Sequence, residues 1–473
     1  MSVARVVVIG AGIGGLAAAA RLTAQGHTVT VVEQAPTVGG KLGWLELDSP
    51  DGCFRFDTGP SLLTMPQVFR DLFAATGDPL ERTLELRRLD PLATYHFADG
   101  TVADADELTD DDGWRRLMDR ARRMWDATAP TFLEAAGPPS LTGLARRSPR
   151  DLPLIAPHRS LRSIGRRYLD DPHRQMFLER YATYSGSDPR RAPAVLATVP
   201  YAEHTFGGWY VEGGLHRLAL ALADRAGTVR TSTGVAGIDL TTGRVSGVRL
   251  SDGGHLPADV VVANSDATAL YRDLLPRPRL VPRGEPSLSG LVVLLGLRGR
   301  TPGVGHHTVL FPAKYDDEFD SVFHGRMPGD PTIYISKPTD PHLAPRGCEA
   351  WFVLVNAPRH GTGPTEFDWD AAGAGDRAAD AVLAGLAARG FDVADRVVVR
   401  QVITPADLQR RTWTPGGSIY GSSGNGARAA FLRPANRSPV PGLFLAGGSA
   451  HPGGGLPLVA LSGAAVARLV GSA

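Results

Sequence analysis

The sequence contains very little cysteine and lysine. Cys53 and Cys348 are the only cysteines among 473 residues, too few for the disulfide framework that stabilises small secreted domains. We therefore expect a protein of a reducing, cytoplasmic compartment. Lysine occurs only at Lys41, Lys314 and Lys337. Arginine, which suits phosphate and carboxylate binding, supplies the remaining positive charge.

Long apolar runs, an excess of charge and metal-binding motifs are also missing. No stretch reaches the roughly 20 unbroken apolar residues of a membrane-spanning helix. The apolar run 6–20 is interrupted by glycines and leads into another strand pattern, so it is not a secretory signal. A net charge of +1 gives no field that attracts nucleic acid. The spaced Cys and His motifs of metal sites and the G-x-S-x-G elbow of hydrolases are absent, so we expect no bound metal.

Glycine, in contrast, is abundant, with 56 residues, and the first glycines form a nucleotide-binding pattern. Residues 5–10 predict a buried parallel strand, 15–26 a helix and 27–33 a second strand. The G-x-G-x-x-G spacing turns the chain, admits a pyrophosphate and lets the helix pack closely. Glu33 ends the second strand, where a carboxylate accepts hydrogen bonds from ribose hydroxyls. The glycines of the turn that we assign to the cofactor are Gly10, Gly12, Gly14 and Gly15.

The next motifs bear on which dinucleotide is bound, since the first pattern leaves NAD and FAD open. Gly39, Gly40 and Lys41 resemble a motif of the flavin amine-oxidase and carotenoid-desaturase superfamily, in which a basic residue follows two glycines near the flavin. The usual residue there is Arg, and Lys41 keeps the charge but loses the forked donor geometry. A further segment resembles the one that passes the flavin ring, and it contains Asp57, Thr58, Gly59 and Pro60.

From residue 207 onward the resemblance becomes specific to bacterial carotenoid desaturases. The segment 207–227 resembles their strand, turn and helix, and the resemblance implies that Val235 makes a backbone contact to adenine. Residues 443–457, LFLAGGSAHPGGGLP, resemble the family's C-terminal flavin motif, although Ser449 and its glycines stand where many flavoproteins have an Asp. A site closed from both ends of the chain fits FAD. The residues assigned to this second wall are Gly447, Gly448, Gly455, Leu456 and Pro457.

The C-terminal region 416–463 looks closest to the 3,4-desaturases that act on 1-hydroxycarotenoids. The resemblance implies a hydrophobic carotenoid substrate, peripheral membrane association, and O2 or a quinone as electron acceptor. Phytoene or neurosporene desaturation is an alternative within the family. A flavin amine oxidase and a flavin protein without net redox chemistry, such as an isomerase, are the other two hypotheses.

Desaturation removes a hydride, which FAD accepts, and a proton, which needs an acceptor. The sequence offers three candidates beside motifs that approach the flavin, namely His204, Glu203 and His451. For His451 we favour a role in fixing its loop. The pair His306–His307 lies in a segment that resembles the substrate domain, and we interpret it as structural.

These motifs predict an α/β fold with a Rossmann-like FAD-binding domain, a β-rich substrate domain and a helical subdomain. We expect the FAD-binding domain to be discontinuous, formed by 1–95, 200–275 and 390–473. The substrate domain then takes 276–389, and a helical lid or membrane-facing region takes 96–199.

The segment 141–191 is rich in arginine beside an apolar helical pattern. Basic residues next to an apolar face suit an anionic membrane surface, and they equally suit a solvated lid over the active site. The segment is therefore predicted to be a membrane-facing surface, a lid, or both. The arginines concerned are Arg146, Arg147, Arg150, Arg159, Arg162, Arg166, Arg167, Arg174, Arg180, Arg190 and Arg191.

Overall fold

A valine-rich strand lies at the centre of a five-stranded parallel sheet. The computed structural model describes residues 3–133, 135–138, 152–276, 284–426, 429 and 432–473. In strand β1 (Arg5–Ile9), Val6 and Val8 point to one face of the sheet and Val7 and Ile9 to the other, and all four are buried. The strand order is β10 (Thr228–Arg230), β2 (Thr28–Val32), β1, β14 (Val260–Ala263) and β20 (Leu443–Leu445).

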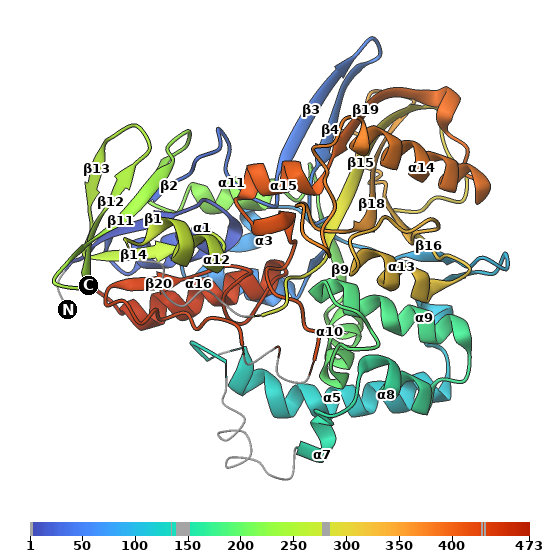
Figure 1. The fold of residues 1–473 in the computed structure, drawn as a ribbon, viewed down its shortest axis with the longest axis horizontal. Coiled ribbons are helices and arrows are strands. Elements are labelled where there is room, and N and C mark those ends of the chain that lie inside the picture. Colours follow the sequence, from blue (N-terminus) through green and yellow to red (C-terminus); the bar gives the residue numbers. More distant parts are fainter. Residues whose placement is uncertain (1–2, 134, 139–151, 277–283, 427–428, 430–431) are drawn as a thin grey trace.

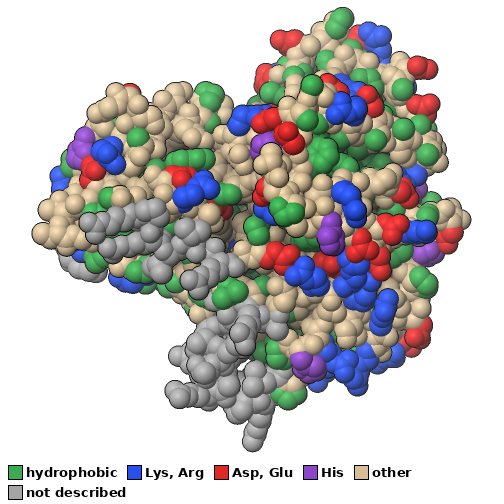
Figure 2. Space-filling view, in the orientation of Figure 1, with side chains coloured by type: hydrophobic (Ala, Val, Ile, Leu, Met, Phe, Trp, Pro, Cys, Tyr) green, Lys and Arg blue, Asp and Glu red, His purple; other side chains and the backbone are tan. Residues whose placement is uncertain are grey.

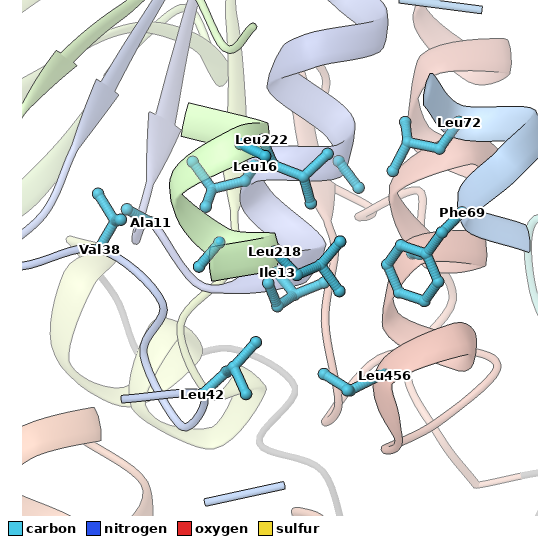
Figure 3. Packing of buried hydrophobic residues seen from close by; sticks show 14 of the residues in the cluster. Ala11, Ile13, Leu16, Val38, Leu42, Phe69, Leu72, Leu218, Leu222 and Leu456 are labelled. Carbon is cyan, nitrogen blue, oxygen red and sulfur yellow. The ribbon is translucent and has the colours of Figure 1, made fainter. Parts of the chain in front are cut away.

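Helices cover one face of this sheet and a small antiparallel sheet covers the other. Figure 3 shows Ile13 and Leu16 beside Leu218 and Leu222, with Phe69 facing the C-terminal helix. These side chains belong to α1 (Ile13–Ala24), α11 (Arg217–Ala223) and α2 (Pro66–Ala74), and the C-terminal helix is α16 (Leu456–Val470). The opposite face packs on β11 (Val235–Thr241), β12 (Arg244–Leu250) and β13 (His255–Pro257), and nearby lie α12 (Ala267–Ala269) and η3 (Leu270–Leu274).

A seven-stranded sheet forms the second body, at the upper right of Figure 1. Within β15 (Ser289–Arg298), Leu291, Val293 and Leu295 pack under α14 (Ala374–Ala388), whereas Val292 and Leu294 face the first core. Both faces are therefore buried, which explains the continuous apolar pattern of this strand. The strand order is β19 (Val397–Ile403), β15 (Ser289–Arg298), β18 (Cys348–Ala357), β17 (Ile333–Ser336), β16 (His307–Leu310), β7 (Thr94–His96) and β8 (Val102–Asp104).

This sheet extends beyond the range 276–389 that the sequence predicted for it. Strands β7 and β8 come from the N-terminal side, and β19 lies after residue 390. β7 pairs in parallel with β16, and β19 pairs antiparallel with β15. Backbone hydrogen bonds thus join β7, β8 and β19 to the strand-rich body, although the sequence analysis had placed these segments in other domains.

Helices between residues 105 and 206 form the third body, at the lower right of Figure 1. Trp114, Leu161, Ile164, Phe177 and Leu178 meet in its core. The apolar faces of α8 and α9 are therefore turned inward rather than toward solvent. The elements are α4 (Ala105–Thr109), α5 (Asp112–Phe132), α7 (Leu152–Ile155), α8 (Leu161–Tyr168), α9 (Pro172–Arg180), η1 (Tyr181–Ser185), η2 (Ala194–Ala197) and α10 (Thr198–Phe206).

Shorter elements connect the three bodies. The hairpin of β3 and β4 projects from the molecule at the top of Figure 1. β9 lies between β5 and β6 in a three-stranded sheet. Their bounds are β3 (Trp44–Ser49), β4 (Gly52–Asp57), β5 (Leu63–Thr64), α3 (Leu80–Thr83), β6 (Leu86–Arg88), β9 (Gly208–Val211), α13 (Tyr315–Val322), η4 (Ala394–Arg396), α15 (Pro405–Thr412) and η5 (Pro415–Gly417).

Candidate functional site

A continuous cavity of about 760 Å³ is lined by residues of all three bodies. It begins at the carboxyl ends of β1, β2 and β14, which is where parallel α/β sheets bind ligands. All of the predicted cofactor residues except Gly15 line it, namely Gly10, Gly12, Gly14, Glu33, Gly39, Gly40, Lys41, Thr58, Gly59, Pro60, Val235, Gly447, Gly448, Gly455, Leu456 and Pro457.

Close backbone contacts explain the glycines of the first motif. Gly10 has a φ of +95°, and a Cβ on Gly15 would lie 2.3 Å from the carbonyl oxygen of Gly10. Gly15 thus serves the packing of helix and strand. A Cβ on Gly14 would lie 2.8 Å from the Cα of Gly447, so the N-terminal turn and the C-terminal loop touch directly. The two ends of the chain form one wall.

Asn264, at the carboxyl end of β14, joins these two loops, and the sequence analysis did not identify it. Its Nδ2 donates to the carbonyl oxygen of Gly10 at 3.3 Å. A Cβ on Gly12 would lie 2.7 Å from the same nitrogen, and a Cβ on Gly447 would lie 2.5 Å from Oδ1. A signal did exist, because Asn264 directly follows the buried run 260–263, and polar residues at that edge of a parallel sheet meet ligands.

Glu33 is buried at the end of the second strand and already holds two backbone groups. Oε2 accepts from the amide of Ala11 at 2.7 Å, and Oε1 accepts from the amide of Ala35 at 2.9 Å. A carboxylate can accept about four hydrogen bonds in total. Glu33 therefore fixes the glycine turn and keeps acceptor capacity toward the cavity that it lines.

Glu33→Ala is expected to weaken cofactor binding by about 10- to 100-fold. The change removes the predicted ribose acceptor and leaves the amides of Ala11 and Ala35 without their partner, and hydrogen bonds to a charged group contribute about 1.5–3 kcal/mol each. The measurement is the dissociation constant for FAD by fluorescence titration. Glu85→Ala, at an exposed position, is the control. Equal affinity of the Glu33→Ala variant and the wild type would exclude the ribose assignment.

Besides Glu33, a cluster of three cations and one carboxylate lines the cofactor end of the cavity. Lys41 donates from Nζ to the carbonyl oxygens of Ser418 at 2.9 Å and Ile419 at 2.6 Å. Burial, opposed by Asp266 and supported by the two neighbouring arginines, lowers the pKa of Lys41 to about 8. The cavity-lining residues of this cluster are Lys41, Asp266, Arg411 and Arg433.

The two arginines of this cluster are held by neutral oxygens. Nη1 of Arg411 donates to Oγ1 of Thr58 at 2.8 Å, and Nη1 of Arg433 donates to the carbonyl oxygen of Gly448 at 2.7 Å. Burial lowers the pKa of Arg433 to about 10. A wall with this surplus of positive charge, beside the N-terminus of α1, fits the two phosphates of a dinucleotide. The abundance of arginine elsewhere in the chain hid both residues from the sequence analysis.

Beyond the cofactor end, the cavity continues between apolar side chains. They come from α5, η2 and α10 on one side and from β15 and β18 on the other. This arrangement suits a long hydrocarbon ligand, which gains about 25 cal/mol for each Å² of apolar surface removed from water. The apolar lining includes Leu62, Met65, Leu92, Trp125, Ala129, Phe132, Val195, Leu196, Val199, Val292, Phe352, Leu354 and Ile403.

Of the three proton-acceptor candidates, Glu203 is the one in the cavity wall. Its Oε1 accepts from the hydroxyl of Tyr181 at 2.7 Å, and burial raises the pKa of its carboxyl. His204 instead lies in the helical core, where Trp114 and Phe177 contact its ring edge-on. Burial lowers the pKa of His204 in that core.

His451 is buried and faces the end of α5. Its Nε2 forms a hydrogen bond with the carbonyl oxygen of Phe132 at 2.6 Å, and its own carbonyl accepts from Nδ2 of Asn436 at 2.8 Å. Burial lowers the pKa of His451 to about 4. These contacts attach the C-terminal glycine loop to the helical body.

Two further observations concern metals and the paired histidines. Within the described residues, no group of three or more His, Cys, Asp or Glu side chains is placed to hold a metal ion. His307 lines the cavity, and its Nδ1 forms a hydrogen bond with the carbonyl oxygen of Leu92 at 3.2 Å. His306 packs edge-on against Tyr210 and His307.

The parallel sheet, the two glycine loops and the cationic wall define an FAD-dependent oxidoreductase. The chain belongs to the family of flavin-containing amine oxidoreductases, whose model matches residues 13–360. When bound, FAD supplies a two-electron acceptor for hydride from the substrate. Gly12, Glu33 and Lys41 are among the residues that would hold it.

Relatives of known activity cover nearly the whole chain. The 4,4'-diapolycopene oxygenase of Methylomonas sp. is 34% identical over 97% of this chain and 96% of that protein. The hydroxyneurosporene desaturase of Cereibacter sphaeroides is 35% identical over 99% and 97%. The 1-hydroxycarotenoid 3,4-desaturase of Flavobacterium sp. is 32% identical over 98% and 99%.

Solved structures agree with the fold. Wild-type putrescine oxidase bound to putrescine superposes with a TM-score of 0.65 at 17% identity and covers 99% of both chains. Cyclohexylamine oxidase from Brevibacterium oxydans superposes with a TM-score of 0.63 at 17% identity, covering 99% of this chain and 100% of its own. At this identity the likeness shows the fold alone.

Proposed function

We propose that this protein is an FAD-dependent carotenoid desaturase, which forms a carbon–carbon double bond in an acyclic carotenoid. The observation that carries the proposal is the apolar extension of the cofactor cavity. The reaction removes a hydride from one carbon and a proton from its neighbour, and the electron pair of the second C–H bond becomes the new π bond. FAD, when bound, would accept the hydride. O2 or a quinone then takes up the two electrons.

The protein itself positions the substrate and excludes water from the site. The side chains of Val292, Phe352 and Leu354 exclude water from the extension and hold the chain of the substrate in one orientation. Of the three proton-acceptor candidates that the sequence offered, Glu203 is the one whose carboxyl lies in the cavity wall, and burial raises its pKa.

The names of the relatives narrow the substrate class. One of them is named a 1-hydroxycarotenoid 3,4-desaturase, so its substrate has a hydroxyl on carbon 1 and reacts at carbons 3 and 4. Another is named a zeta-carotene-forming phytoene desaturase, and it is 34% identical over 98% of this chain. Desaturation of a hydroxylated or a plain acyclic carotenoid is therefore the function that we assign to this site.

An amine substrate suits the site less well. Amines are cations at neutral pH, and the extension beyond the cofactor end is lined mainly by apolar side chains. Burial of a cation in such surroundings is unfavourable unless it is paired. A long hydrocarbon is the better match for the extension.

Expression in bacteria that accumulate different acyclic carotenoids tests the proposed function. We expect a product that is two hydrogens lighter and absorbs at longer wavelength, detected by chromatography with mass spectrometry of the extracted pigments. The Gly12→Val variant, which is expected to lack the cofactor, is the control. Unchanged pigment in every strain, with flavin-loaded protein present in the cells, would refute the proposal.

The structure limits how such an enzyme reaches a membrane. Within the described ranges, no helix is both long and apolar enough to cross a bilayer. Arg146, Arg147 and Arg150 lie outside the described residues. In the remainder of the segment, Arg162 binds Glu179 and Asp316, and it is largely buried. Figure 2 shows that the Lys and Arg side chains on the lower right are interspersed with Asp and Glu.

We infer that the exposed arginines of α8 provide the peripheral membrane contact. Arg166→Glu with Arg167→Glu is expected to weaken binding to anionic liposomes by about 5- to 30-fold at low salt, because each arginine contributes about 1 kcal/mol near an anionic surface. The measurement is co-sedimentation with the liposomes. Arg230→Glu with Arg244→Glu, on the flavin domain, makes the same change in charge at exposed positions. Equal loss in both pairs, or no loss in the first, would contradict a docking role for α8.

A further inference from the structure

Two charged side chains interrupt the apolar wall of the cavity. Arg180, the last residue of α9, and Glu203, on α10, both line it, yet they are only 9% and 2% exposed. Burial of an arginine and a glutamate in an apolar cavity is unfavourable unless each finds hydrogen-bond partners. Arg180 and Glu203 therefore each require hydrogen-bond partners, from the protein or from a ligand.

Each of these side chains keeps hydrogen-bonding capacity that the protein does not use. Nη1 of Arg180 donates to the hydroxyl of Tyr184 at 2.9 Å, but its Nε and Nη2 have no hydrogen-bond partner in the described part of the chain. Oε1 of Glu203 accepts from the hydroxyl of Tyr181 at 2.7 Å, whereas Oε2 is buried and has no partner among the described residues. Unused donors and an unused acceptor thus remain in the wall.

Tyrosines hold the two charges close together in a fixed frame. The rings of Tyr181 and Tyr184, the partners of Glu203 and Arg180, lie 5.1 Å apart between centroids. The guanidinium of Arg180 also lies 5.9 Å from the ring of Tyr95 and 5.5 Å from that of Tyr334. These contacts with ring faces stabilise the cation and restrict its movement.

The same frame places the cluster at the border between the cofactor end and the apolar extension. The hydroxyl of Tyr334 forms a hydrogen bond of 2.6 Å with Oγ of Ser61. Ser61 directly follows Gly59 and Pro60, in the segment that we assign to the flavin ring. A ligand group bound by Arg180 and Glu203 would therefore lie near the bond that is oxidised.

We propose that Arg180 and Glu203 form a binding site for a hydroxyl group on the substrate and select hydroxylated over plain carotenoids. A hydroxyl can accept from the guanidinium and donate to the carboxylate at the same time, which a hydrocarbon cannot do. The inference rests on the proposed function, because it assumes that a carotenoid occupies the extension. In this role Glu203 holds the substrate rather than receiving its proton.

The wild-type enzyme provides the first arm of the test. An acyclic carotenoid with a hydroxyl near one end and the same carotenoid without it compete for the enzyme in liposomes, and the two products are separated by chromatography. We expect a ratio of kcat/KM of at least about 100 in favour of the hydroxylated compound, since a site built to bind a hydroxyl discriminates strongly against an analogue that lacks it.

Variants provide the second arm. Glu203→Leu and Arg180→Met are expected to bring the ratio down to within about threefold of unity, mainly because kcat/KM for the hydroxylated substrate falls. Glu203→Gln keeps an acceptor oxygen and therefore retains part of the preference. Glu85→Leu and Arg244→Met make matched changes at exposed positions and leave the ratio unchanged. Flavin content and thermal unfolding confirm that each variant is folded, and the ratio itself is independent of the amount of active enzyme.

The outcomes separate this inference from the proposed function. Turnover of both carotenoids by the wild type at equal rates would overturn the hydroxyl site and leave the desaturase standing. Turnover of neither would overturn both. A Glu203→Leu variant that loses kcat equally on both substrates, with the ratio intact, would identify Glu203 as the proton acceptor and overturn the binding role.

Discussion

Gly12→Val is expected to yield a folded protein that purifies without FAD. A Cβ at this position would lie 2.7 Å from Nδ2 of Asn264, and the two remaining methyl groups would enter the space in front of the N-terminus of α1. Overpacking alone costs about 1–3 kcal/mol, and the lost contacts to phosphate add to this cost. We expect affinity for FAD to fall by at least about 100-fold, measured as the ratio of flavin to protein absorbance.

Gly329→Val is the matched control for this substitution. A Cβ on Gly329 meets no atom within 4 Å, so the same side chain is accommodated at the surface. The control is expected to keep its flavin. Full flavin occupancy in the Gly12→Val protein would show that the phosphate site was assigned to the wrong loop.

Gly447→Val is expected to remove FAD from the other end of the chain. Gly447 has a φ of +100°, and a Cβ on it would lie 2.5 Å from Oδ1 of Asn264. The side chain would push the C-terminal loop away from Gly14 and open the wall that the two termini form together. We expect a loss of flavin as large as that of Gly12→Val, at least about 100-fold, although the first motif is intact.

Gly243→Val separates the loss of the wall from simple backbone strain. Gly243 also has a positive φ, of +81°, but a Cβ on it meets nothing within 4 Å. Both variants share the strain of a branched residue in a left-handed conformation, and only Gly447→Val blocks the wall. If Gly243→Val also loses its flavin, or if Gly447→Val keeps it, the C-terminal loop is not a wall of the cofactor site.

The residues that the sequence assigned to the cofactor, Gly15 excepted, line one cavity, because that half of the site depends on local pattern. The glycine turn lies between a strand and a helix whose periods are visible in the sequence, although α1 begins at Ile13, two residues before the predicted start. The C-terminal loop was found through its resemblance to a family motif. In both cases the residues that matter are neighbours in the chain.

The rest of the site could not be predicted because its residues meet only in three dimensions. Asn264 contacts Gly10 across 254 residues, and Arg411 contacts Thr58 across 353. Arg180 appeared in the sequence as one basic residue among many in 141–191, which we interpreted as a membrane-facing or lid segment. Burial among tyrosines gives it a different environment from the exposed Arg166 and Arg167.

The extent of the seven-stranded sheet escaped prediction for a similar reason. β7 and β8 have three residues each, too few to show a strand period. β7 pairs with β16, which lies more than 200 residues later in the chain. Such a pairing is set by the neighbouring body and not by the local sequence.

Anaerobic mixing of the FAD-loaded protein with an acyclic carotenoid tests the central claim most directly. The visible band of the flavin is followed in a stopped-flow spectrometer, and the molecular mass of the extracted carotenoid is determined by mass spectrometry. The account predicts that the flavin band bleaches while one product two hydrogens lighter forms for each flavin reduced. A flavin band that stays oxidised while the carotenoid binds, or is converted only into an isomer of the same mass, would contradict it.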